Sequence, residues 1–194
     1  MPRGVGWALA LAAVVLGVLM FVAITSGDDE VSKLGSTQPP SGLPGDRVTT
    51  NAEPPAGNVD DTLPDLSFLR FDGTTASLAE YAGTPLVINF WASTCTPCVT
   101  EMPDFEEVHQ ELGDDVTFLG INVTEGVDPG RGMIERTGIT YDVGRDPKGD
   151  VIRALGGINL PTTVIVAADG TIVEVSGKQL TADDLRDKLA SVLP

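Results

Sequence analysis

Residues 86–98 decide the fold. They read Leu-Val-Ile-Asn-Phe-Trp-Ala-Ser-Thr-Cys-Thr-Pro-Cys and contain both cysteines of the chain. Residues 86–91 are nearly all apolar, which is typical of a strand in a parallel sheet that is covered on both faces. From Thr96 onward the apolar residues recur every three or four positions, as in a helix with one buried face: Val99, Met102, Phe105, Val108 and Leu112. We therefore expect Cys95 and Cys98 where a strand passes into a helix.

This position suits thiol chemistry. The unpaired N–H groups and the positive dipole end of a helix stabilise a thiolate, so we expect the pKa of Cys95 to lie below the usual value of about 8.5. Cys98, one helical turn later, is expected to be more buried and less ionised. Cys95 would attack a disulfide to form a mixed disulfide, and Cys98 would resolve it by closing the Cys95–Cys98 ring. The spacing thus predicts a thiol–disulfide exchange centre.

Other uses of the two cysteines fit less well. A purely structural disulfide over so short a loop would constrain the unfolded chain very little. Structural zinc sites take four ligands, mostly Cys and His, and the chain has one histidine, His109, besides its two cysteines. Haem attachment needs a histidine directly after the second cysteine, where Val99 stands. We expect no resident metal or cofactor, and copper(I) held by both thiolates near Met102 stays open as an alternative function.

The N-terminal residues predict a membrane anchor. Residues 4–24 carry no charge, and a helix of that length spans roughly 30 Å of hydrocarbon. Arg3 precedes them and Asp28 follows, which favours a cytoplasmic N-terminus and places the rest of the chain outside the cell membrane. A cleaved signal peptide, giving a secreted protein, is the alternative. Residues 1–27 are thus expected to form a single-pass anchor or a signal.

Two further regions follow. Residues 28–61 are rich in proline, glycine, small polar and acidic residues, which is typical of a flexible linker. Residues 62–194 are long enough for one packed domain. There we expect strands at 66–71, 116–123, near 141–143, 162–166 and 171–175, a helical turn at 77–81, and helices at 131–136, 150–155 and after Thr181. This alternation predicts an α/β sheet with helices on both faces and an antiparallel hairpin, turning at Asp169-Gly170, at one edge.

Several separated motifs resemble one known family. Residues 89–98, Asn-Phe-Trp-Ala-Ser-Thr-Cys-Thr-Pro-Cys, followed by Pro103, resemble the thioredoxin superfamily, and Leu-Pro-Thr-Thr at 160–163 resembles its substrate loop. Glu101 and an extra strand–helix segment around 123–143 resemble the membrane-anchored TlpA/ResA group of thiol–disulfide oxidoreductases. The resemblance covers roughly residues 64–193 and implies a thioredoxin-like fold with a central mixed sheet.

The resemblance also implies roles for individual residues. Cys95 would be the attacking thiol and Cys98 the resolving one, with Glu101 moving protons and shifting the thiol pKa values. By spacing alone, a solvated helix acid is the better reading of Glu101, and the resemblance reverses that preference. Pro161 would be cis, so that the Leu160 backbone lies beside Cys95 and pairs with a peptide substrate. Trp91 would lie near the thiols as a substrate-binding residue, although a core position fits it nearly as well.

Departures from the family pattern leave the direction of the reaction open. Asn89 occupies the position where thioredoxin usually has a proton-accepting aspartate, so that task must fall on Glu101 or on water. Thr94 replaces a frequent tryptophan, and the pair Thr96-Pro97, which helps to set the reduction potential, is not one of the commonest. Reduction of disulfides follows the group, and oxidation of secreted proteins is the alternative. Peroxidase activity is less favoured, because the Pro-x-x-x-Thr-x-x-Cys arrangement of peroxiredoxins does not precede Cys95.

The expected partners follow from the same resemblance and from the charge. They are disulfide-containing proteins, including apocytochrome c before haem attachment, and a membrane thiol carrier that donates electrons. The formal net charge of −16 argues against nucleic acid as a partner.

Overall fold

The computed structural model describes residues 59–193. The predicted anchor at 1–27 and most of the predicted linker lie outside the described residues. No helix within 59–193 is long and apolar enough to cross a membrane. Hydrogen bonding to the sheet begins at Asp60, whose N–H donates to the Ile172 carbonyl at 2.8 Å, so the last residues assigned to the linker run beside a strand.

The described residues form a thioredoxin-like α/β fold around one seven-stranded sheet, with strand order β2-β1-β5-β4-β3-β6-β7. The central strands β3, β4 and β5 are parallel, and the strands beyond them on either side pair antiparallel. The strands are β1 Ser67–Arg70, β2 Thr75–Ser77, β3 Leu86–Trp91, β4 Thr117–Val123, β5 Asp142–Asp146, β6 Thr162–Val166 and β7 Ile172–Ser176. The predicted mixed sheet and the β6–β7 hairpin at one edge are confirmed.

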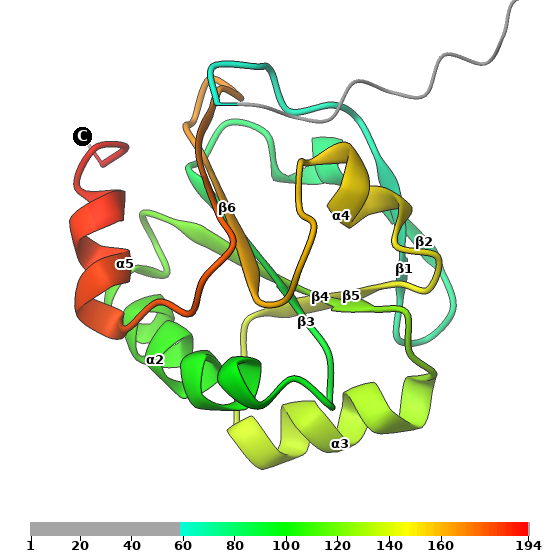
Figure 1. The fold of residues 1–194 in the computed structure, drawn as a ribbon. Coiled ribbons are helices and arrows are strands. Elements are labelled where there is room, and N and C mark those ends of the chain that lie inside the picture. Colours follow the sequence, from blue (N-terminus) through cyan, green and yellow to red (C-terminus); the bar gives the residue numbers. More distant parts are fainter. Residues whose placement is uncertain (1–58, 194) are drawn as a thin grey trace, which may run out of the picture. The chain divides into compact units, whose positions relative to one another are not determined.

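Helices cover both faces of the sheet, as predicted. They are η1 Leu78–Tyr81, α2 Thr96–Leu112, α3 Val127–Thr137, α4 Asp150–Ala154 and α5 Ala182–Leu189. Side chains of α2, α3 and α5 share one core cluster with Val87 and Trp91, whereas η1 and α4 pack with Ile88 and Phe90 in the other cluster. Figure 1 shows α2, α3 and α5 on one side of the sheet and α4 on the opposite side. Alternate residues of β3 therefore point into two different cores.

The local predictions placed one helix start wrongly and missed one short strand. Helix α3 begins at Val127 instead of residue 131, because Pro129 is tolerated in a first helical turn and does not end the segment. Gly130 is a packing position there, since a Cβ atom would lie 2.8 Å from the Phe71 ring. The sequence also gave no sign of strand β2, a three-residue strand that forms a second hairpin with β1 at the other edge of the sheet.

Candidate active site

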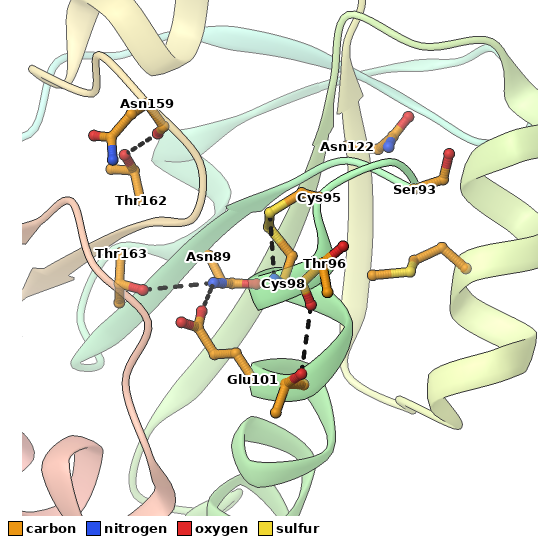
Figure 2. Close-up of a disulfide and its surroundings, with 12 residues drawn as sticks. Asn89, Ser93, Cys95, Thr96, Cys98, Glu101, Asn122, Asn159, Thr162 and Thr163 are labelled. Carbon is orange, nitrogen blue, oxygen red and sulfur yellow. Dashed lines mark hydrogen bonds between the residues drawn. A yellow bond between two sulfur atoms is a disulfide. The ribbon is translucent and has the colours of Figure 1, made fainter.

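Cys95 and Cys98 form a disulfide at the start of α2, as Figure 2 shows. Cys95 is the N-cap of the helix, and its Sγ accepts a hydrogen bond from the Cys98 N–H at 3.3 Å. Its sulfur thus takes the place that a serine or aspartate oxygen has in an ordinary helix cap. Cys98 has no exposed surface, whereas Cys95 is partly exposed. The predicted difference in burial between the two cysteines is confirmed.

Glu101 lies one helical turn after Cys98, on the same face of α2, and is fully buried. Its Oε1 accepts a hydrogen bond from Asn89 Nδ2 at 2.6 Å, and its Oε2 accepts one from the Leu180 N–H at 2.9 Å. Burial raises the pKa of Glu101 to about 7, although the two hydrogen bonds favour the ionised form. The alternative reading of Glu101 as a solvated helix acid is wrong, and the site contains a carboxyl group that titrates near neutral pH.

Asn89 connects Glu101 to the sheet. It is 1% exposed on β3 and pairs in register with Thr163 of β6, whose hydroxyl lies 3.5 Å from Asn89 Nδ2 (Figure 2). The amide nitrogen therefore donates to both Glu101 and Thr163, whereas Asn89 Oδ1 is buried without a hydrogen-bond partner. An amide cannot take up a proton at neutral pH, so Asn89 itself cannot be a proton acceptor in this site.

The loop before β6 lies at the end of the sheet where the disulfide is. Thr162 pairs with Phe90, so Leu160 and Pro161 sit beyond the C-terminal end of β3, where the chain continues to Cys95. The Leu160–Pro161 peptide bond is cis, as the resemblance implied. Leu160 is half-buried and packs against the same core cluster as Cys95. The substrate-binding role of these two residues stays a prediction.

Trp91 is fully buried in the core beneath α2. Its indole packs closely against Gly120 of the neighbouring strand, where a Cβ atom would lie 2.9 Å from Trp91 Nε1. A side chain with no exposed surface cannot touch a docked protein without moving. The structure therefore places Trp91 as the core residue that the sequence also allowed, and not at a substrate-binding surface.

Glu125, which the sequence did not single out, holds the loop that leads to Cys95. Its carboxylate accepts hydrogen bonds from the Ser93 N–H at 2.8 Å, the Ser93 hydroxyl at 2.7 Å and Asn122 Nδ2 at 2.7 Å. Partial burial opposes ionisation, but the bonds from Ser93 and Asn122 hold the pKa of Glu125 below its usual value. The strand order could have indicated this contact, because residues that follow neighbouring parallel strands lie at the same edge of the sheet.

Comparison with known proteins is consistent with this site. Residues 59–175 match the AhpC/TSA family. The chain belongs to this thioredoxin-like family. It is 31% identical over 139 residues to the thiol–disulfide oxidoreductase ResA of Geobacillus thermodenitrificans. The matched region covers 70% of this chain and 79% of the relative.

Two solved structures are similar to this thiol–disulfide oxidoreductase of the ResA/DsbE type. A thioredoxin-family thiol:disulfide interchange protein of Chlorobium tepidum is 28% identical, with a TM-score of 0.62, and the match covers 72% of this chain and all of the other. A secreted thiol–disulfide isomerase of Corynebacterium glutamicum is 27% identical, with a TM-score of 0.60, and the match covers 68% and 83% of the two chains. Both support thiol–disulfide chemistry at the Cys-x-x-Cys pair.

The described part of the oxidoreductase has no group of three or more His, Cys, Asp or Glu side chains placed to hold a metal ion. His109 packs against both Phe118 and Tyr141, with ring centroids 5.3 and 5.7 Å away. Met102, the residue considered beside a copper(I) ion, is fully buried in the core. Within residues 59–193, no specific contact favours copper(I) over disulfide exchange.

Proposed function

We propose that this oxidoreductase reduces disulfides of proteins outside the cytoplasm, apocytochrome c among them, with Cys95 as the attacking thiol. The observation that carries the proposal is the asymmetry of the pair. A partly exposed cysteine caps a helix, and a fully buried cysteine and a buried carboxyl group follow on the same helix.

The reaction begins with the reduced enzyme. The Cys95 thiolate, stabilised by the N–H groups of the first turn of α2, attacks one sulfur of the substrate disulfide. The substrate's other sulfur leaves as a thiolate and takes up a proton, and Cys95 stays bound to the substrate as a mixed disulfide. Cys98 loses its proton and attacks Cys95 Sγ, which releases the second substrate thiolate. Both leaving thiolates take up their protons from water, so the substrate gains two electrons and two protons, and the enzyme ends with the Cys95–Cys98 disulfide.

Glu101 takes up the proton of Cys98 in the second step. Its position one turn behind Cys98 on α2 supports this role, as does its pKa of about 7, because a general base works best with a pKa near the working pH. Asn89 and the Leu180 N–H orient the carboxylate through its two hydrogen bonds. In this proposal both are positioning groups.

We place the catalytic domain, residues 62–194, outside the cell membrane, joined by the linker at 28–61 to an anchor at 1–27. The uncharged residues 4–24 support an anchor, and the similarity to a secreted isomerase supports an extracytoplasmic domain. A thiol carrier in the membrane would return the Cys95–Cys98 disulfide to the dithiol. Oxidation of secreted proteins by the disulfide form is the alternative direction.

Trapping in membranes tests the proposed substrates. The Cys98→Ser variant of the full chain cannot resolve the mixed disulfide, so we expect reducible adducts on Cys95 that include apocytochrome c. The Cys95→Ser variant is the matched control and should yield none. Equal adducts on both variants, or none on Cys98→Ser, would contradict the assigned roles. Adducts that lack any cytochrome polypeptide would remove that substrate.

A further inference from the structure

Ile158 is 96% exposed, which makes it the most exposed large apolar side chain among the described residues. The other exposed large hydrophobic residue between 59 and 193 is Val59, at 49%. Single exposed apolar side chains are common on protein surfaces and need no explanation by themselves. Ile158 differs because of how its loop is held and where the loop lies.

The loop that carries Ile158 is anchored on both sides of it. The Gly157 N–H donates to the Ile152 carbonyl at 2.9 Å, and Asn159 Nδ2 donates to the Gly177 carbonyl at 2.7 Å. The Thr162 hydroxyl closes the loop by donating to the Asn159 carbonyl at 2.6 Å (Figure 2). Gly157 packs so closely on Ile152 that a Cβ atom would lie 2.5 Å from its side chain. The neighbouring residues are thus fixed to the protein, and Ile158 between them points into solvent.

This loop borders the active site. Ile158 precedes the cis bond at Pro161 by three residues, and the pairing of Thr162 with Phe90 sets this turn at the end of the sheet where β3 leads to Cys95. Figure 1 shows the loop between α4 and β6 turning at the end of the sheet where α2 begins. The surface that a substrate meets on reaching Cys95 therefore includes this loop.

The segment that holds the disulfide and the loop that carries Ile158 contain no charged residues of their own. Residues 93–98 and 156–163 contain no acidic or basic side chain, in a chain whose net charge is −16. These two uncharged segments, with one projecting apolar side chain, match an uncharged, apolar segment of a partner. Contact between two apolar side chains removes both from water, which is the favourable term in most protein association.

We propose that Ile158 determines substrate specificity by contacting an apolar side chain next to the disulfide cysteine of an extended protein segment. This inference rests on the proposed function, the reduction of protein disulfides. It predicts that the enzyme distinguishes protein-like disulfides by their apolar neighbours, whereas small disulfides without such neighbours react independently of Ile158.

The test measures rates with the reduced full chain in mild detergent. Three disulfides are compared: a synthetic peptide with leucine before a disulfide-bonded cysteine, the same peptide with serine in place of leucine, and the small aromatic disulfide DTNB. For the leucine peptide, Ile158→Ser should lower the second-order rate constant about tenfold, the usual effect of losing one small apolar contact. The rates with the serine peptide and DTNB, and the reduction potential, should not change. Val59→Ser, at the other exposed apolar residue, is the matched control and should change nothing.

Each outcome is decisive. Equal rates of the wild-type and Ile158→Ser proteins with the leucine peptide would overturn the inference, as would a wild-type protein that does not prefer leucine over serine. A slower reaction of Ile158→Ser with DTNB as well would assign the effect to the thiols and reject docking. If the wild-type dithiol failed to react even with DTNB, the proposed function would fail and the inference with it.

Discussion

At the scale of single residues, the burial of Glu101 has the largest chemical consequence. A carboxyl group without exposed surface keeps its charge only through the two hydrogen bonds from Asn89 and Leu180. Because its pKa is raised to about 7, Glu101 exists in both protonation states near neutral pH. Both its proposed role and its effect on stability follow from this one property.

The kinetic prediction for Glu101 concerns the second step of exchange. Reduced enzyme mixed with DTNB releases one coloured thiolate when Cys95 attacks and a second when Cys98 resolves the adduct. For Glu101→Gln we expect the second phase to slow about 100-fold near pH 7, the usual size of a general-base contribution, and to lose its rise through pH 7. The first phase should change little.

The exposed Glu135→Gln, which removes one charge from α3, is the control for this measurement. A second phase of Glu101→Gln that matches wild type in rate and pH dependence would rule out Glu101 as the base.

The same carboxyl group predicts how stability depends on pH. Between pH 4.5, the ordinary pKa, and about 7, the unfolded chain loses this proton before the folded one, so the free energy of unfolding should fall as pH rises. The contribution is fully present below pH 4.5 and lost above pH 7, and amounts to about 3 kcal/mol. Urea unfolding of the disulfide form at several pH values should show wild type losing this amount relative to Glu101→Gln. Parallel curves would show that burial does not raise the pKa of Glu101.

The residues of this site differ in how far the sequence could predict them. Cys95 and Cys98 were predictable because the strand, the helix and the spacing are local signals. The contact of Glu101 with the Leu180 N–H was not predictable, since 79 positions separate the partners. The position of Glu101 three residues after Cys98 does not show whether its side chain is solvated or buried, because both kinds of helix turn have the same spacing.

At the scale of elements, the loop between β3 and α2 depends on the end of β4. Glu125 takes hydrogen bonds from the N–H and the hydroxyl of Ser93, and Arg136 donates to the Ser93 carbonyl at 3.4 Å. The two strands are parallel neighbours, so their C-terminal ends lie together. Side chains that follow β4 and lie on α3 thus help to fix the loop that presents Cys95.

A double-mutant cycle tests this contact. Ser93→Ala and Glu125→Ala should each lower the free energy of unfolding, and the two effects should be coupled by about 1 kcal/mol, because the hydroxyl–carboxylate bond is lost in either variant. Ser77→Ala is the control partner, since Ser77 shares no hydrogen bond with Glu125, and its effect should add to that of Glu125→Ala. Additive effects of Ser93→Ala and Glu125→Ala would show that the contact contributes nothing to stability.

The elements themselves were predictable where periodicity was long and regular. The strand at Leu86–Trp91 was predicted residue for residue, and the cap of α5 by Thr181 and Asp184 is present. The start of α3 was missed because Pro129 and Gly130 are residue types that disfavour helix interiors. In the structure Pro129 fits a first helical turn, and Gly130 allows a close contact with Phe71. Strand β2 was missed because three residues carry too little pattern to distinguish a strand from a loop.

At the scale of the whole molecule, the fold brings three distant segments to one end of the sheet. The cysteine pair follows β3, Glu125 follows β4, and the loop with Leu160, Pro161 and Ile158 precedes β6. The alternation of apolar segments predicted the sheet. It did not predict that these three segments lie together, because that depends on the order of the strands. The ion pairs of Arg186 with Glu107 and Glu111 likewise join α5 to α2 over a long separation in sequence.

We propose that the Cys95–Cys98 dithiol reduces substrate disulfides. The reduction potential of the pair tests this proposal most directly. The full chain is equilibrated with mixtures of reduced and oxidised glutathione or a stronger dithiol, and the dithiol fraction is measured. We predict a potential below about −250 mV, near that of thioredoxins, so that the dithiol donates electrons to substrate disulfides. A potential near −120 mV, where strong disulfide oxidants lie, would contradict the account.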